Sequence, residues 1–413
     1  MSGTTLDDYT DRYAARIGGM AQSEIRALFA VASRPEIVSL AGGNPYTAAL
    51  PLPELADMFA RLIRDQGTEA LLYCPGQGST RLREQICEVM ADSGIDSTSG
   101  ASPDDVVVTV GAQQGLDLLA RVFCDPGDIV LAEGPTYVGA LGVFSAAQAT
   151  VVHVEMDADG LIPEALEAAI VASPRPPKLL YTVPTYQNPT GVTLSAPRRA
   201  EVLDICARHG VLVIEDDPYG MLGFEGDPPR PLRADTGDGV FYLGTFSKIF
   251  AAGLRVGWVL APPAVRDKLV MASEAQILCP SALTQAAVTE YLATMPWRQQ
   301  VKAFQVLYRE RRDALLESLA DYMPQDMTWT RPGGGLFVWA DLPPGIHSKK
   351  MLPAALTQRV AYVPGTGFYA NGDGGGQMRL NFSFPSADRI REGVRRLAGV
   401  VTTTAELRDT FAR

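Results

Sequence analysis

Lys248 occupies a position where an amine could act as a nucleophile. It ends the string Gly244-Thr245-Phe246-Ser247-Lys248, which begins at the end of an apolar stretch, and small and apolar residues follow it up to Arg255. Because burial of an ammonium ion is costly, we expect the pKa of this lysine to be lowered. A neutral amine can form a Schiff base with an aldehyde. A lysine here can equally extend its charged end to water, so this residue alone does not decide between chemistry and structure.

Two further apolar stretches end in residues that could hold a heterocyclic ring. Val211–Glu215 leads into Asp216-Asp217-Pro218-Tyr219, and Leu179–Val183 leads into a polar turn that contains Asn188. A carboxylate at such a place can pair with a ring nitrogen and keep it protonated. Solvated acids and an ordinary turn would use the same residue types.

A fourth stretch ends in a sequence that suits a phosphate group. Val106–Val110 is followed by Gly111-Ala112-Gln113 and then by a helical pattern. Small residues at the start of a helix expose backbone N–H groups, which bind phosphate. Each of the four sites alone has a structural explanation, but no single structural explanation covers all four. The sequence therefore predicts a ligand site at these strand ends.

The elements that must position these residues alternate between strand and helix. Helical spacing between most of the apolar stretches argues for a mainly parallel seven-stranded α/β sheet covered by helices on both faces. Such a sheet binds its ligands at the carboxyl ends of the strands. The expected strands are Val106–Val110, Ile129–Ala132, Val151–Val154, Leu179–Val183, Val211–Glu215, Val240–Gly244 and Val256–Leu260.

The pattern after Leu260 is that of a smaller α+β lobe. Ser281 to about Leu319 predicts a long helix that is broken near Met295-Pro296. The elements expected beyond it are the strands Gly335–Ala340, Arg359–Val363 and Met378–Phe382 and a closing helix at Ala387–Leu397. The first fifty residues lack strand periodicity and carry the turn sequence Ala41-Gly42-Gly43-Asn44-Pro45, so we expect an arm that packs on the rest.

Composition narrows the class of protein. The chain of 413 residues is long enough for two lobes, and its 46% of hydrophobic residues excludes general disorder. The 47 acidic residues outnumber the 36 basic ones, a net charge of -11 that argues against nucleic-acid binding. Five scattered cysteines without a C-x-x-C pair indicate a reducing compartment, and three scattered histidines indicate no metal site. A polar N-terminus and the lack of a membrane-length apolar run predict a soluble, cytoplasmic protein without membrane partners.

The motifs together resemble a known family. The string Gly244 to Arg255, with Asp216-x-x-Tyr219 and Asn188-Pro189-Thr190-Gly191 before it, resembles the fold-type I aminotransferases of class I and II, which use pyridoxal 5'-phosphate. The resemblance runs from about Ser23 to Leu397. Ser23-Glu24-Ile25-Arg26 and Gln187 are most similar to the branch of the 2-aminoadipate and kynurenine aminotransferases. Related transcription regulators carry a basic winged-helix segment that we do not find before this chain.

The resemblance implies a division of the chain and a role for each matching residue. It implies an N-terminal arm at 1–50 against the small domain and a dimer partner, a large cofactor-binding domain at 51–285, and a small substrate-clamping domain at 286–413. Lys248 would carry the cofactor as an internal aldimine and shuttle the proton, and Asp216 would pair with the pyridinium nitrogen. Asn188 and Tyr219 would contact the phenolic oxygen of the ring, and Tyr137 would stack on its face.

The remaining implied contacts concern the phosphate and the substrate. Those to the phosphate come from Gly111, Ala112, Gln113, Thr245, Ser247 and Arg255 and, across a homodimer with shared sites, from Tyr73 of the other subunit. Arg379, in Met378-Arg379-Leu380-Asn381-Phe382, would clamp the α-carboxylate of the substrate, with Asn188 and Gly43 beside it.

The resemblance also predicts the reaction. We expect an amino group to move between an L-amino acid and a 2-oxo acid by a ping-pong cycle. The sequence departs from relatives at Asn44 and at Ser79-Thr80-Arg81, which lie near the substrate pocket in the family. These departures leave the substrate open. They also leave an alternative, pyridoxal-phosphate-dependent elimination, replacement, cyclisation or oxidation of an amino acid.

Overall fold

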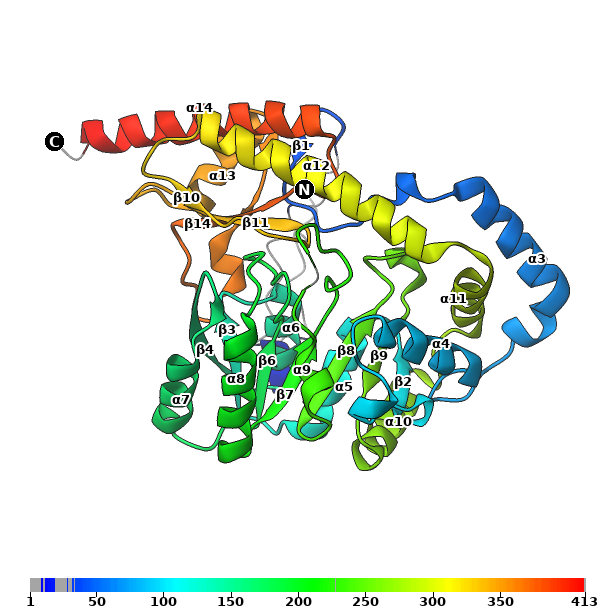
Figure 1. Ribbon diagram of the computed structural model, residues 1–413. Helices are drawn as coiled ribbons and strands as arrows, with labels where there is room; N and C mark the ends of the chain where they lie inside the picture. The colour runs from blue at the N-terminus through cyan, green and yellow to red at the C-terminus, as the bar shows by residue number, and fades with distance from the viewer. Residues whose placement is uncertain are drawn as a thin grey trace.

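The computed structural model describes residues 9, 12–18, 28, 32, 34–226 and 228–411. Figure 1 shows a large lobe built on a central sheet and a smaller lobe on which two long helices, α12 (Trp297–Tyr322) and α14 (Ala387–Phe411), lie side by side. Helix α3 (Leu52–Ala70) projects to one side and packs against α11 (Ala282–Thr294). The predicted motif Ser23-Glu24-Ile25-Arg26 lies outside the described residues.

The large lobe contains the predicted sheet. Its order is β2-β9-β8-β7-β6-β3-β4-β5, and β9 runs antiparallel to both of its neighbours while β3, β4, β6, β7 and β8 pair in parallel. All seven predicted strands are confirmed, and the two-residue strand β5 was not predicted. The bounds are β2 (Val106–Thr109), β3 (Ile129–Gly134), β4 (Thr150–Asp157), β5 (Gly160–Leu161), β6 (Leu179–Thr182), β7 (Leu212–Asp216), β8 (Val240–Thr245) and β9 (Gly257–Leu260).

Alternation along the strands divides the core into two layers. Ile129 and Leu131 belong to one apolar cluster with residues of α7 and α8, whereas Val130 and Ala132 belong to the other with residues of α5 and α6. Successive side chains of a strand point to opposite faces, so a parallel sheet with two covered faces needs apolar residues at every position. The helices of this lobe are α4 (Thr80–Ala91), α5 (Ala112–Phe123), α6 (Val138–Ala146), α7 (Pro163–Ala172), α8 (Ala196–His209), α9 (Leu232–Asp235) and α10 (Pro263–Ile277).

The link between the lobes follows the prediction. Helices α11 and α12 replace one continuous helix, because Pro296 interrupts the pattern between them. Helix α14 extends well beyond the predicted end at Leu397, since residues 398–411 contain no proline and Ala398, Val400 and Val401 continue its buried face.

The small lobe is a four-stranded antiparallel sheet in the order β10-β11-β14-β13. Its elements are β10 (Thr328–Trp329), β11 (Phe337–Asp341), β13 (Val363–Pro364), β14 (Gln377–Asn381) and α13 (Ser348–Thr357). The predicted strand Arg359–Val363 is divided into β12 (Val360–Ala361) and β13, which pair with different partners. The partner of β12 is β1 (Val38–Ser39) in the arm, where we predicted no strand. Pairing with β12 supplies the order that two residues cannot encode alone.

Candidate active site

Three consecutive carboxylates end β7, and each has a different environment. Glu215 accepts the backbone N–H groups of Leu232 (2.7 Å) and Arg233 (2.8 Å). Asp217 accepts the Tyr242 hydroxyl at 3.0 Å and the Gly220 N–H at 2.9 Å. These two acids therefore hold the loops around them.

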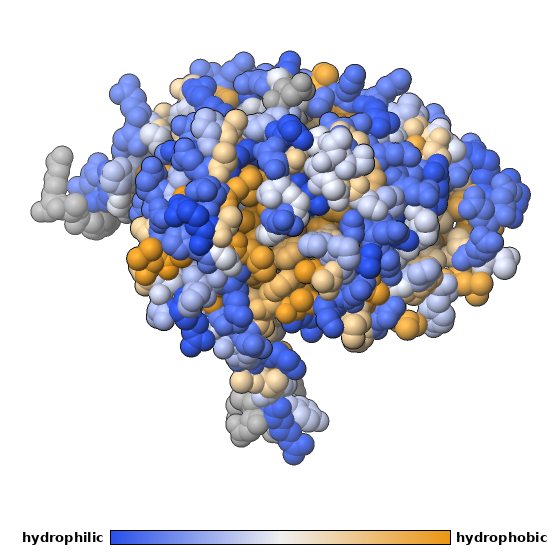
Figure 2. All heavy atoms as spheres, turned by 60° about the horizontal axis from the view of Figure 1, so that its bottom comes forward, coloured by the Kyte–Doolittle hydropathy of each residue, from blue (hydrophilic) through white to orange (hydrophobic). Residues whose placement is uncertain are grey.

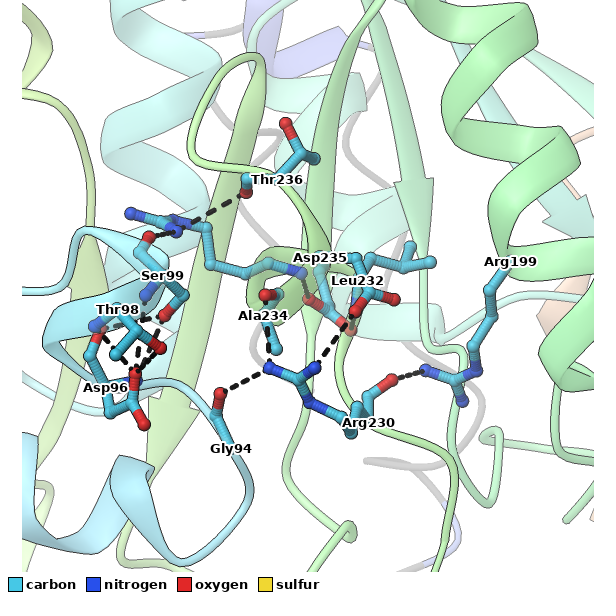
Figure 3. Close-up of polar contacts among 12 residues, drawn as sticks. Gly94, Asp96, Thr98, Ser99, Arg199, Arg230, Leu232, Ala234, Asp235 and Thr236 are labelled. Atoms are coloured by element: carbon cyan, nitrogen blue, oxygen red, sulfur yellow. Dashed lines mark hydrogen bonds and ion pairs between the residues drawn. The ribbon is translucent and has the colours of Figure 1, made fainter.

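Figure 3 shows the segment around Leu232, whose backbone N–H group donates to Glu215. Arg230 lies between Gly94 and Asp235, and its guanidinium donates to the carbonyl oxygen of Gly94 at 3.0 Å. Arg199 donates in turn to the carbonyl oxygen of Arg230 at 2.9 Å. The segment after the β7 loop is thus tied to the turn at residues 94–99. None of the hydrogen bonds in this network reaches a predicted site residue.

Asp216 differs from its two neighbours because one of its oxygens is unused. Tyr181, on β6, donates to Oδ2 at 2.8 Å, while the buried Oδ1 has no hydrogen-bond partner among the described residues. Burial raises the pKa of Asp216 to about 7, against the opposing effects of the Tyr181 hydrogen bond and of the Lys248 ammonium. A buried acceptor without a donor is expensive, so this oxygen fits a cationic N–H group of a ligand.

Lys248 lies within the same cluster of charges. Its Nζ atom donates to the carbonyl oxygen of Gly43 in the arm at 2.9 Å. Burial first, and then the Arg379 and Arg255 guanidinium groups, lower the pKa of Lys248 to about 8. The surroundings of Lys248 therefore lower its pKa in the direction expected from the sequence, so that a fraction of the amine is neutral near neutral pH.

Arg379, on β14, reaches the site from the small lobe. Its Nη1 atom donates to Oδ1 of Asn188 at 2.9 Å, and its Nη2 atom donates to the carbonyl oxygens of Ala41 (2.9 Å) and Gly42 (3.2 Å). The buried Nε atom has no partner among the described residues. Burial lowers the pKa of Arg379 to about 10. An under-used guanidinium in an apolar wall suits a carboxylate ligand.

Two aromatic rings hold that guanidinium in place. Its carbon Cζ lies 4.1 Å from the ring centroid of Phe337 and 5.1 Å from that of Phe368. Phe337 in turn meets the Tyr219 ring edge to face at 6.0 Å. Burial, followed by the charge of Tyr137, raises the pKa of Tyr219, whose hydroxyl also bonds Asn188. Tyr219, Asn188 and Arg379 therefore form one connected wall.

The predicted phosphate site is a narrow cradle beside Lys248. Gly111 precedes α5 with φ of 76°, and a Cβ atom there would overlap the Arg255 guanidinium. Arg255 bonds Oγ of Ser247 at 3.5 Å, and Ser247 accepts the Thr245 hydroxyl at 2.9 Å. A helix N-terminus, a guanidinium and two hydroxyls are donors suited to a dianion. Ala112 and Gln113 supply the first two amides of α5.

Tyr137 and Tyr73 occupy contrasting positions. Tyr137 precedes α6, and burial followed by the Asp216 charge raises its pKa, which places the phenol near that carboxylate. Tyr73 lies on the loop after α3 and is 85% exposed. The structure brings together all the predicted site residues except Tyr73.

The residues present fit the cofactor that the resemblance implies. The unpartnered Asp216 Oδ1, the cradle at Gly111 and the amine of Lys248 correspond to a ring nitrogen, a phosphate and an aldehyde. Sequence reasoning missed Tyr181 and Phe337, which fall within apolar strand patterns. Strand parity offered a signal for Tyr181, because it pairs with Ile214 and therefore shares a face with Asp216.

Two features of other kinds of site are absent from the described part of the chain. None of its helices is long and apolar enough to cross a membrane. Within the same residues, His, Cys, Asp and Glu side chains do not gather in a group of three or more that could hold a metal ion.

Known proteins resemble this chain over most of its length. The family model of the aminotransferases of class I and II matches residues 35–397. The chain is 37% identical to the aromatic-amino-acid aminotransferase 1 of Thermococcus litoralis, over 95% of each chain. The kynurenine aminotransferase of Pyrococcus horikoshii superposes with a TM-score of 0.91 and 37% identity, covering 97% of this chain and 99% of the other. The α-aminoadipate aminotransferase of Thermus thermophilus, complexed with N-(5'-phosphopyridoxyl)-L-leucine, gives 0.89 and 34% with the same coverage.

Proposed function

Since this chain belongs to the aminotransferases of class I and II, we propose that Lys248 is its catalytic amine and that Asp216 and Tyr219 complete the catalytic set. The predicted family, fold type and branch are confirmed. The protein is a pyridoxal-phosphate-dependent aminotransferase. Its relatives favour transamination over the alternative of elimination, replacement, cyclisation or oxidation.

We assign the cofactor contacts to the two clusters around Lys248. The backbone at Gly111, Ala112 and Gln113 and the side chains of Thr245, Ser247 and Arg255 would hold the phosphate. Asp216 would face the ring nitrogen through Oδ1, Tyr137 would cover one face of the ring, and Asn188 and Tyr219 would contact its phenolic oxygen. The unpartnered Asp216 Oδ1 is the observation that carries this assignment.

The cofactor supplies an electron sink for the α-carbon of the substrate. The residues of this chain do the rest. Arg379, which bonds Asn188, binds the α-carboxylate and so fixes the amino acid, and Gly43 lies beside the amine of Lys248. Lys248, whose amine is neutral in a large fraction near pH 8, would remove the proton from the α-carbon of the substrate and deliver it to C4′ of the cofactor. Asp216 would pair with a protonated ring nitrogen, which favours the ionised form of this carboxyl group.

Carbonyl oxygens of the arm occupy both the amine of Lys248 and the guanidinium of Arg379. The Gly43 carbonyl accepts from Nζ, and the neighbouring Ala41 and Gly42 carbonyls accept from Arg379. An incoming carboxylate is a stronger acceptor for a guanidinium than a carbonyl oxygen is. Substrate binding would therefore displace the arm carbonyls from Arg379.

We also propose that the enzyme is a homodimer with shared active sites. The loop after α3 exposes Leu71, Leu72 and Tyr73 by 67%, 63% and 85%, and apolar residues gather in the middle of the face shown in Figure 2. Apolar patches of this kind mark interfaces, and a second copy would bring Tyr73 to the phosphate cradle. In this dimer the arm at 1–50 would pack on the small domain and on the partner, the large domain at 51–285 would bind the cofactor, and the small domain at 286–413 would clamp the substrate.

The substrates we propose are an L-amino acid and a 2-oxo acid, and the compartment is the cytoplasm. All five cysteines are free, which supports a reducing compartment. Relatives are named for aromatic amino acids, kynurenine and 2-aminoadipate. A first panel of donors should therefore include aromatic and dicarboxylic amino acids.

The test is a half-reaction followed by absorbance. Purified protein loaded with pyridoxal phosphate is mixed with each amino donor in turn, without an acceptor. We expect one donor class to convert the bound cofactor to its amine form and a 2-oxo acid to reverse the change. A protein that takes up no cofactor, or whose cofactor no donor converts, would refute the proposal.

A further inference from the structure

We propose that Glu133 is a positioning residue of this active site, which clasps the loop of Tyr137 to the loop of Asn188 through the side chain of Gln187. The inference rests on the proposed function of Tyr137 and Asn188. It concerns a residue that touches neither substrate nor cofactor and acts through others.

Glu133 is a buried carboxylate whose bonds all lead towards one loop. It lies on β3, is 1% exposed, and accepts the Thr182 hydroxyl at 2.6 Å through Oε1. Its Oε2 atom accepts the Val183 N–H at 3.2 Å and Nε2 of Gln187 at 3.1 Å. Retaining a carboxylate in such a place costs free energy that a neutral core residue would not. An active site that needs its loops held in a fixed position would explain why a carboxylate is kept here.

Gln187 is the second half of the clasp, and its amide is fully used. Nε2 donates to Glu133 and also to the carbonyl oxygen of Pro135 at 2.7 Å. Oε1 accepts the N–H of Thr190 at 2.9 Å and its hydroxyl at 2.7 Å. An amide has two donors and two acceptor positions, so this side chain has no other choice of orientation.

The clasp joins the two loops at their functional ends. Pro135 is two residues before Tyr137, and Gln187 immediately precedes Asn188. Asn188 also accepts from Arg379, so its position affects the proposed carboxylate clamp. Loss of the clasp would therefore disturb the ring face, the ring oxygen and the substrate together.

The pattern of donors permits a test that separates geometry from charge. In Glu133→Gln the amide oxygen can take the place of Oε2 and keep the bonds from Val183 and Gln187. The amide N–H can then donate to Thr182, because a hydroxyl accepts as well as donates. The clasp survives in this variant while the charge is lost. In Glu133→Ala both are lost.

Glu215 provides a matched control. Like Glu133, it is 1% exposed and lies on the central sheet. It accepts two backbone N–H groups, but these belong to Leu232 and Arg233, outside the proposed site. Glu215→Ala should lower the melting temperature without changing the cofactor or substrate parameters. Any general effect of removing a buried carboxylate appears in this control.

The experiment measures four properties in wild type, Glu133→Gln, Glu133→Ala, Gln187→Met and Glu215→Ala. They are the melting temperature, the dissociation constant for pyridoxal phosphate, the visible circular dichroism of the bound cofactor, and the KM for the best donor. We expect Glu133→Ala and Gln187→Met to weaken cofactor binding and raise KM by about tenfold, the scale of lost hydrogen bonds in a buried network. Both should change the dichroism, and Glu133→Gln should stay within about twofold of wild type on every measure.

Three results would overturn the inference. The first is a Glu133→Ala variant that changes only the melting temperature, as Glu215→Ala does. The second is a Glu133→Gln variant as damaged as Glu133→Ala, since that would assign the effect to charge. The third, decisive if Glu133→Ala does not fold, is a Gln187→Met variant with normal cofactor and substrate parameters. These results differ from a failure of the proposed function, because in that case the wild-type protein would bind no pyridoxal phosphate.

Discussion

Tyr181 donates its phenolic hydrogen to Oδ2 of Asp216 over 2.8 Å, while the buried Oδ1 of the same carboxylate has no hydrogen-bond partner among the described residues. The two residues lie on adjacent parallel strands, β6 and β7, with their side chains on one face of the sheet. The hydrogen bond opposes the effect of burial on the pKa of Asp216. Tyr181 thus favours the ionised form that a pyridinium nitrogen requires, and it also fixes which oxygen is offered.

Tyr181→Phe should weaken the enzyme most at low pH. Without the phenolic donor the pKa of Asp216 rises further, so a larger fraction of the carboxyl group is protonated below neutral pH. A hydrogen bond to a charged group is worth about 1.5–3 kcal/mol, so we expect kcat/KM to fall about tenfold or more. The acidic limb of the pH profile should move to higher pH. An unchanged profile would show that Tyr181 does not tune this carboxylate.

Asp216→Asn should stabilise the cofactor-free protein while it abolishes activity. Burial raises the pKa of Asp216 from 3.8 to about 7, so between these values the folded chain keeps a proton that the unfolded chain releases. The free energy of unfolding therefore falls as the pH rises through this window, and above pH 7 the cost is complete, on the order of 4 kcal/mol. The asparagine avoids this cost.

The measurement is a pair of denaturation curves at pH 5 and pH 8 for wild type and variant without cofactor. The variant should gain more at pH 8 than at pH 5. An equal difference at both values, or a loss of stability at pH 8 alone, would contradict the raised pKa.

Lys248 should bind the cofactor faster as the pH rises towards 8. Its pKa of about 8 means that the neutral, nucleophilic fraction grows about tenfold per pH unit below that value and then levels off. Stopped-flow absorbance of the cofactor-free protein mixed with pyridoxal phosphate measures the rate. Lys248→Ala should give no lysine-bound absorbance and no turnover, whereas Lys178→Ala, at an exposed lysine, should behave as wild type.

The sheet, which the structure confirms, and the strand ends that carry the proposed cofactor contacts could both be predicted from local patterns. A parallel strand covered on two faces is apolar at every position, as in Val106–Thr109, and its end is marked by a change to polar or small residues. Each of Lys248, Asp216, Asn188 and Gly111 follows such a change. The arm strand β1 could not be predicted, because its two residues gain their order from β12, more than 300 residues away in the sequence.

The residues that the sequence did not reveal act across strands. Tyr181 lies inside an apolar stretch and Glu133 directly follows one, and a buried tyrosine or a single acid there has many structural explanations. Their partners, Asp216 and Gln187, are 35 and 54 residues away along the chain. Only the pairing of β3, β6 and β7 shows that they serve the same site.

Arg379→Ala should separate substrate binding from cofactor binding. The variant loses the paired hydrogen bonds to the α-carboxylate, so we expect KM for amino acids to rise about a hundredfold or more. The dissociation constant for pyridoxal phosphate should change by less than about threefold, because the phosphate cradle around Arg255 is separate. Arg379→Lys should recover little, since an ammonium cannot form the two-pronged contact. A normal KM in Arg379→Ala would assign the clamp elsewhere.

Tyr73 should act on the active site of the other subunit. In this chain it is 85% exposed and apart from the cradle of Gly111, Ser247 and Arg255. If a second copy presents Tyr73 to the phosphate, Tyr73→Phe loses one hydrogen bond to a charged group and should bind pyridoxal phosphate about tenfold more weakly.

Exchange of subunits gives the decisive comparison. A dimer of one Tyr73→Phe chain and one Lys248→Ala chain contains one site with an intact lysine, and the tyrosine of that site comes from the Lys248→Ala chain. That site should bind cofactor and turn over as wild type does. Mixing Tyr73→Phe with the double variant Tyr73→Phe/Lys248→Ala should restore nothing, because no chain then supplies the hydroxyl. Equal cofactor affinity in the two mixtures, with subunit exchange verified by mass, would show that Tyr73 serves its own chain or none.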